Sequence, residues 1–143
     1  MKIADVMRSR GTTDVVTVSP DQTVTELLAV LAEHRIGAVV VSADGSSVDG
    51  IVSERDIVRR LNDRGAQVLQ VPVSEIMTKT VHTCTDDDKL EQIAVLMTTQ
   101  RVRHLPVMRE DALFSIVSIG DVVKFRIEQL QAERDQLVDY IHR

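Results

Sequence analysis

The sequence predicts a mixed α/β fold of the α+β class, in which two tandem β-α-β-β-α repeats pack as a pseudo-two-fold pair and a C-terminal helix follows. The first observation is a duplicated motif: residues 50–58 and 115–123 both run from aliphatic residues through a serine and two variable residues to an aspartate and two more aliphatics. The second observation is that other segments recur in the same order. The number of residues that separates a segment from its second copy (the offset) changes only from one segment to the next, never within a segment. Ordered offsets indicate insertions and deletions in loops, so the chain is a tandem duplication. The matching segments are 3–7 with 73–77, 15–21 with 81–87, and 34–40 with 100–106.

Each repeat begins with a short strand and a helix that opens at Asp21 or Asp87. Apolar residues with helical spacing follow each aspartate, as expected for a helix that covers a sheet. An aliphatic strand comes next, at 38–41 and at 105–108, and turn residues at 43–47 and 109–111 return the chain antiparallel into the duplicated motif. The apolar helix positions are Val24, Leu27, Leu28 and Leu31 in the first repeat, and Leu90, Ile93, Ala94 and Met97 in the second.

The duplicated motif itself is predicted to be a strand that ends where a helix begins. A serine can cap that helix, and the aspartate three residues later lies in the first turn, where backbone N–H groups favour negative charge. The first of these helices should end near Gly65, which suits a left-handed C-cap. One repeat offers only about 50 to 60 residues, a marginal core, so the two should pack face to face. The expected division is repeat one at 1–66, a linker at 67–72, repeat two at 73–125 and the C-terminal helix at 126–143.

The C-terminal helix carries a short heptad-like apolar seam. Its members are spaced by three and four residues around Arg134, and neither Gly nor Pro interrupts the segment after Val122. An apolar helical stripe fits a helix folded back on its own repeat and a dimer-forming helix equally well, so both remain open. The seam residues are Ile127, Leu130, Leu137 and Ile141.

Composition limits the classes of partner. The net charge is −5 with no basic block, and aromatic residues make up 2%, so neither phosphate-backbone binding nor base stacking on nucleic acid is expected. The single cysteine, Cys84, excludes an internal disulfide and fits a reducing compartment. The N-terminus has no apolar signal region, and no apolar run approaches membrane-spanning length. We therefore expect a cytoplasmic protein without membrane association.

The duplicated pattern resembles the cystathionine-beta-synthase (CBS) domain, and two copies resemble the CBS pair or Bateman module. The resemblance covers residues 3 to about 125. It implies a non-enzymatic regulatory module that binds an adenosine-containing ligand, such as AMP, ADP, ATP, NAD or S-adenosylmethionine, and no catalytic cofactor. It also implies a homodimer and an unidentified regulated protein as partners. IMP dehydrogenases carry such a pair within a large barrel, which this sequence lacks, so that activity is not expected.

The resemblance also implies a set of ligand-binding residues in which each site is shared between the motif of one repeat and the first strands of the other. Asp56 and Asp121 would bind the ribose hydroxyls, assisted by Ser53 and Ser118. The base would be bordered by Thr83 and Thr17, with an apolar wall that includes Ile51 and Ile116. All of these lie in or beside segments that recur in both repeats.

The repeats differ where phosphate would bind. The second has Arg103 and His104 at the positions where the first has Gly37 and Ala38, and arginine presents a fork that matches phosphate oxygens. Arg55 and Lys124 are further candidates beside the helix starts. The two sites are therefore expected to be unequal. Asp56 is expected to face the strands of repeat two, where Arg103 and His104 lie.

Simpler interpretations stand beside these. Ser-x-x-Asp also forms a capping box that is complete without any ligand, and a lone basic residue usually lies on a solvated helix face. Cys84 matches a core position and is expected to be an inert buried thiol, and no two histidines have metal-ligand spacing. The alternative function is therefore a ligand-independent structural or protein-interaction module.

Overall fold

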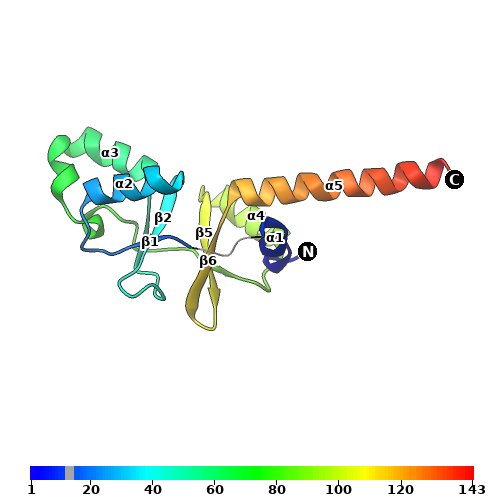
Figure 1. The fold of residues 1–143 in the computed structure, drawn as a ribbon, viewed down its shortest axis with the longest axis horizontal. Helices are drawn as coiled ribbons and strands as arrows, with labels where there is room; N and C mark the ends of the chain where they lie inside the picture. Colours follow the sequence, from blue (N-terminus) through cyan, green and yellow to red (C-terminus); the bar gives the residue numbers. More distant parts are fainter. Residues whose placement is uncertain (12–14) are drawn as a thin grey trace.

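The computed structural model describes residues 1–11 and 15–143, and this part of the chain contains two three-stranded sheets, each covered by helices (Figure 1). The β-α-β-β-α order predicted for each repeat is confirmed. Each repeat opens with a short helical segment, which is α1 (Ile3–Arg10) in the first and the 3-10 helix η2 (Val73–Glu75) in the second. The 3-10 helix η1 (Ala66–Gln70) lies mostly in the stretch expected to be the linker. The first repeat contains β1 (Thr17–Val18), α2 (Val24–His34), β2 (Ala38–Val41), β3 (Gly50–Ser53) and α3 (Glu54–Arg64). The second contains β4 (Cys84–Thr85), α4 (Leu90–Thr99), β5 (His104–Arg109), β6 (Ala112–Ser118) and α5 (Ile119–Ile141).

Both sheets have the same topology. In each, the first strand pairs parallel with the middle strand, and the middle strand pairs antiparallel with the last. The parallel pair needs a crossover, which α2 and α4 provide. The register sets Ala38 opposite Ser53 in the first sheet and His104 opposite Ser118 in the second. The start of each middle strand therefore lies beside the point where the last strand passes into its helix.

The serines of the duplicated motif cap the helices as predicted. The Asp56 backbone N–H donates to Ser53 Oγ at 3.3 Å, and the Ser53 N–H donates to Asp56 Oδ2 at 2.8 Å. The equivalent distances between Ser118 and Asp121 are 3.0 and 2.9 Å. Two otherwise unpaired backbone donors are satisfied at each helix start, which explains why the strand ends there. The helix α3 ends at Arg64, and Gly65 follows as its C-cap as expected, with a positive φ of 77° that glycine adopts without strain. Its ψ of −171° lies outside the left-handed helical region, so the expected left-handed cap is not formed.

The opening segments of the two repeats are exchanged between the two cores. Ile3 and Val6 of α1 are buried in the cluster that contains Leu105 of the second repeat. Val73 and Ile76 are buried in the cluster of the first repeat. Backbone bonds accompany this packing, including Ile3 N–H to Asp88 O at 3.0 Å and Val73 N–H to Gln22 O at 2.7 Å. Each core therefore takes its opening segment from the other repeat. The expected linker at 67–72 contains most of η1, whose Val68 is buried in the first core, and the division of the chain at this stretch stays a prediction.

Direct backbone bonds also join the two halves. Ile51 in β3 and Thr78 exchange two hydrogen bonds of 3.0 and 2.8 Å, so that Thr78 extends the first sheet as an isolated bridge. The Leu113 N–H in β6 donates to the carbonyl of Ser46, in the loop before β3, at 2.7 Å. The edge strand of each sheet, β3 or β6, is thus bonded to a segment of the other repeat, in addition to the exchanged opening segments.

The helix α5 is longer than its counterpart α3, and it continues without a break across residue 125. Its first part packs against α1 and α4, and its last part projects away from both repeats (Figure 1). All four residues of the predicted seam are exposed, from 48% for Leu130 to 75% for Ile141. The helix does not fold back on its own repeat. No helix in residues 1–11 and 15–143 is long and apolar enough to cross a bilayer.

Candidate functional site

The first candidate site is the corner where β3 passes into α3. The Asp56 carboxylate accepts from the Ser53 N–H at 2.8 Å and from the Ser53 hydroxyl at 3.0 Å, and both bonds end on Oδ2. Asp56 and Ser53 are half-buried, so both are accessible from the solvent side of the corner. Within the described residues, Asp56 Oδ1 receives no hydrogen bond, and a carboxylate oxygen can accept two. The corner therefore has a fixed carboxylate with free acceptor capacity.

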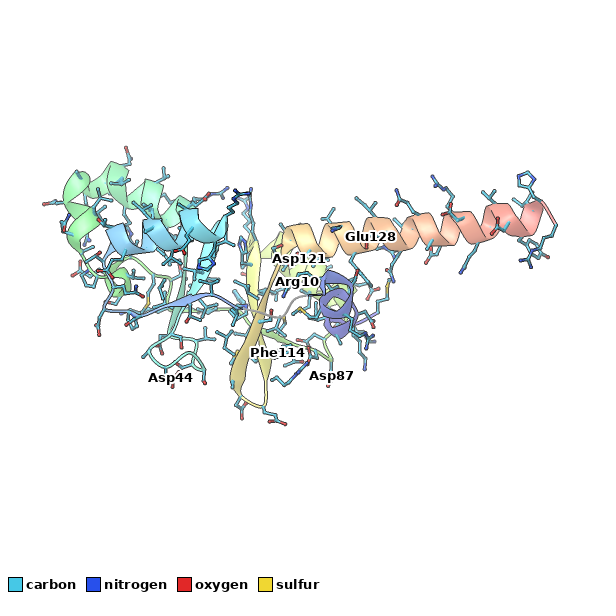
Figure 2. The ribbon with its side chains drawn as sticks, viewed as in Figure 1. Arg10, Asp44, Asp87, Phe114, Asp121 and Glu128 are labelled. Carbon is cyan, nitrogen blue, oxygen red and sulfur yellow. The ribbon has the colours of Figure 1, made fainter. Side chains whose placement is uncertain are left out.

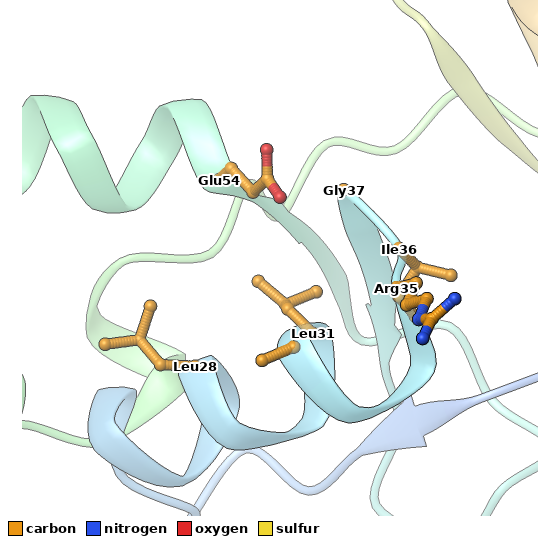
Figure 3. A pocket seen from close by; sticks show the side chains of 7 residues that line it. Leu28, Leu31, Arg35, Ile36, Gly37 and Glu54 are labelled. Atoms are coloured by element: carbon orange, nitrogen blue, oxygen red, sulfur yellow. The ribbon is translucent and has the colours of Figure 1, made fainter.

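A hollow lies beside this corner. It is lined by Gly37 at the start of β2, Glu54 at the start of α3, and Arg35 and Leu31 from the end of α2 (Figure 3). The Glu54 N–H donates to the Gly37 carbonyl at 2.9 Å, so the two elements are joined at the hollow's edge. A side chain in place of Gly37 would meet the Glu54 carboxylate at 3.8 Å, an ordinary contact. The hollow combines an apolar wall with one cation and one carboxylate, a mixture that suits a polar organic ligand.

The second corner, where β6 passes into α5, contains a residue that the sequence analysis missed. The Arg10 guanidinium reaches it from the end of α1 and donates from Nη1 to Asp121 Oδ2 at 3.0 Å and to the Ile116 carbonyl at 2.6 Å (Figure 2). From Nη2 it donates to the Ser115 hydroxyl at 2.6 Å. Repeat one has four extra residues between its opening segment and its first strand, but this difference in length does not indicate which side chain reaches the corner.

His104 and Arg103 lie in the second corner as well. His104 is opposite Ser118 in the sheet, and the Ile119 N–H donates to the Arg103 carbonyl at 2.8 Å. Burial lowers the pKa of His104 below its usual value, the Asp121 carboxylate acts in the opposite direction, and Arg103 adds to the lowering. His104 is therefore the electrostatic neighbour of Asp121 in its own repeat. That Arg103 and His104 also bind the phosphate of a ligand held by Asp56 stays a prediction.

The other predicted site residues are distributed around the two corners. Ala38 is buried at the start of β2, beside Ser53, and Thr17 is half-buried in β1. Thr83 is exposed, just before β4. Arg55 and Lys124 are exposed on the first turns of α3 and α5, and Lys124 lines a small hollow together with Arg10 and Asp121.

Cys84 lies away from both corners, inside the second core. It is 2% exposed, and burial raises the pKa of its thiol to about 12. A protonated, inaccessible thiol is neither a nucleophile nor a metal ligand at neutral pH. Within residues 1–11 and 15–143, no three His, Cys, Asp or Glu side chains are grouped so that they could hold a metal ion.

The fold and the paired corners define a tandem-repeat module with one candidate site per repeat. The family model of the CBS domain matches the chain twice, at residues 3–63 and 73–128. The chain belongs to the CBS-domain family and contains a CBS pair. The resemblance and the fold class expected from the sequence are thereby confirmed.

Relatives in sequence and structure support this assignment. The chain is 33% identical over 146 residues to the mitochondrial CBS domain-containing protein CBSX3 of Arabidopsis thaliana, a match that covers 97% of this chain and 71% of the relative. The crystal structure of the CBS-domain containing protein ATU1752 from Agrobacterium tumefaciens matches with 45% identity and a TM-score of 0.83, covering 88% of this chain and 99% of that one. The CBS domain pair of MJ0100, solved with 5′-methylthioadenosine and S-adenosyl-L-methionine, shares the fold at 19% identity and a TM-score of 0.78. It covers 90% of this chain and 98% of that one.

Proposed function

We propose that this chain is a non-enzymatic sensor that binds an adenine nucleotide or another adenosine-containing ligand at the corner formed by β3 and α3. The observation that carries the proposal is the Asp56 carboxylate, held on Oδ2 by Ser53 with Oδ1 free of hydrogen bonds within the described residues, beside the hollow at Gly37 and Glu54. A carboxylate with free acceptor capacity suits a pair of ribose hydroxyls. The half-buried Ile51, in the same strand, adds apolar surface for a base.

Signalling would follow from linkage between the ligand and the arrangement of the repeats. Ile51 is two residues before Ser53 and is bonded to Thr78 of the second repeat through both of its backbone groups. A ligand at the corner therefore contacts a strand whose edge is shared by both halves. A ligand that binds one arrangement of the halves more tightly than another shifts the population towards it, and a partner protein can detect that shift.

A ligand-independent structural or interaction module is the second candidate. The observation in its favour is that both motif aspartates already take part in complete capping boxes. Such an aspartate stabilises its helix start without any ligand. The two candidates differ in what a nucleotide does to the folded protein, because a ligand specific for the native state must raise the melting temperature.

The test is a thermal-shift panel with AMP, ADP, ATP, NAD and S-adenosylmethionine, followed by calorimetric titration of the most stabilising compound. Asp56→Asn keeps a side-chain acceptor for the Ser53 N–H but removes the charge, so it should fold and bind roughly tenfold to a hundredfold more weakly. Asp63→Asn is the matched control, because Asp63 is an exposed residue near the end of the same helix. No stabilisation by any of the five compounds, or equal affinity of Asp56→Asn and the wild type, would reject the proposal.

The proposal includes a homodimer and a regulated protein as partners. The exposed apolar residues of α5 support the dimer, since a soluble helix rarely leaves such a stripe uncovered. A cytoplasmic location and the absence of nucleic-acid and membrane partners stay predictions from composition, and the Arabidopsis relative is a mitochondrial protein.

A further inference from the structure

We propose that Arg10 is a built-in occupant of the Asp121 corner, so that the chain binds its adenosine-containing ligand at the Asp56 corner alone. This inference rests on the proposed function, because it concerns which of two equivalent corners accepts the ligand. It identifies Arg10 as the residue that makes the pair asymmetric.

The guanidinium of Arg10 satisfies three acceptors of the second corner at once. Nη1 donates to the Ile116 carbonyl at 2.6 Å and to Asp121 Oδ2 at 3.0 Å, and Nη2 donates to Ser115 Oγ at 2.6 Å. Ser115 is completely buried, and the Arg10 and Asp121 side chains are only 20% and 26% exposed. A charge-assisted contact in a partly buried place is stronger than one at the surface. Arg10 is therefore held in the corner by several bonds that support one another.

Two of the residues that Arg10 contacts, Asp121 and Ile116, are predicted to hold a ligand. Asp121 is the expected ribose acceptor, and Ile116 belongs to the expected wall for the base. Nη1 of Arg10 bonds both the Asp121 carboxylate and the backbone carbonyl of Ile116, so the guanidinium lies within hydrogen-bond distance of both residues. Figure 2 shows Arg10 beside Asp121. A ligand there would have to displace a cation from Asp121 and leave the buried Ser115 hydroxyl without its partner. Unsatisfied buried polar groups are costly, which favours Arg10 over the ligand.

The first corner differs from the second in what surrounds the positions equivalent to those that Arg10 contacts. Ile51, the counterpart of Ile116, is bonded to the backbone of Thr78 instead of to a side chain. Gly50 replaces Ser115, and a side chain there would come within 2.6 Å of Met77 Sδ. Within residues 1–11 and 15–143, no salt bridge reaches Asp56. The Asp56 corner therefore lacks an internal cation in the described chain and keeps its carboxylate available.

The cause of the difference is the length of the opening segments. In repeat one, α1 continues to Arg10, whereas in repeat two η2 ends at Glu75 and the chain passes directly into the bridge at Thr78. The extra turn carries Arg10 across to the second corner, because α1 is packed in the second core. The exchange of opening segments is thus what delivers the cation to Asp121.

The first test is the number of nucleotides bound per chain, measured by calorimetric titration with AMP and with ATP. We expect about one per wild-type chain and about two per chain of Arg10→Ala, because removal of the guanidinium frees the Asp121 corner. Arg8→Ala is the matched control, because Arg8 lies on the same helix with a side chain that is 74% exposed and should leave the number at one. Arg10→Met, which keeps the aliphatic stem, replaces Arg10→Ala if the latter fails to fold. Two nucleotides per wild-type chain, or one per chain of the folded Arg10 variant, would overturn the inference.

The second test uses no ligand. Melting temperatures of Arg10→Ala, Asp121→Asn and the double variant should be non-additive, with the double variant little worse than the more damaging single change, because contacting residues share their loss. Additive shifts would show that Arg10 is not held by Asp121 and would overturn the inference. If the melting temperatures are non-additive but the protein binds no nucleotide, the contact between Arg10 and Asp121 is upheld and the proposed function is rejected. Two nucleotides per wild-type chain would support the proposed function and reject Arg10 as an occupant of the Asp121 corner.

Discussion

Replacing Ile3 with alanine tests the exchanged opening segments, on which the arrangement of both corners depends. The Ile3 side chain is 0% exposed, and it lies in the same buried cluster as Leu105 and Val117 of the second repeat. Truncation of a buried isoleucine to alanine typically costs about 2–5 kcal/mol, as lost transfer energy plus a cavity. A domain of this length has a net stability of roughly 7–20 kcal/mol, so the loss is a substantial share.

The informative measurement is amide hydrogen exchange, because it reports where the stability is lost. In Ile3→Ala, the amides of β5 and β6 should exchange faster by roughly 30-fold or more, while those of β2 and β3 change less, because the cavity lies in the second core. Ile76→Ala is the matched variant: Ile76 is 2% exposed in the first core, and its loss should affect β2 and β3 first. Faster exchange confined to β2 and β3 in Ile3→Ala, or equal acceleration in both sheets, would refute the exchanged packing.

Two further predictions concern pH and assembly. Burial lowers the pKa of His104 below its usual 6.5, so the folded protein takes up a proton at this residue less readily than the unfolded chain does. The stability that neutral His104 contributes is therefore fully present above pH 6.5, and it is lost as the pH falls through the lowered pKa of the folded state. The melting temperature should therefore fall between roughly pH 7.5 and pH 5, and His104→Gln should reduce the fall; an unchanged fall would contradict this origin. Light scattering at micromolar concentration should give a dimer for the intact chain, and a chain truncated after Phe125 should dissociate more readily, because the exposed stripe of α5 is removed. A monomeric mass for the intact chain would rule the dimer out, and an unchanged dimer after truncation would remove only the helix's role.

The features that the sequence predicted well depend on local chemistry. Ser53 and Asp56, like Ser118 and Asp121, lie three residues apart, and a capping box needs only that spacing at the end of a strand. The alternation of short aliphatic runs with helical patterns gave the element order, and the duplication showed that the order occurs twice. The placement of all predicted ligand contacts relative to a bound molecule stays a prediction.

By itself, then, the sequence determined the family, the repeated β-α-β-β-α order and the two capped corners, since these depend on spacings of a few residues. Only the tertiary structure decided that the opening segments are exchanged, that α5 projects from its repeat, and that Arg10 occupies the Asp121 corner. The physical reason is sequence separation. Arg10 and Asp121 are 111 residues apart, and no local pattern states which of many surface arginines will be carried to a given carboxylate by the packing of a helix.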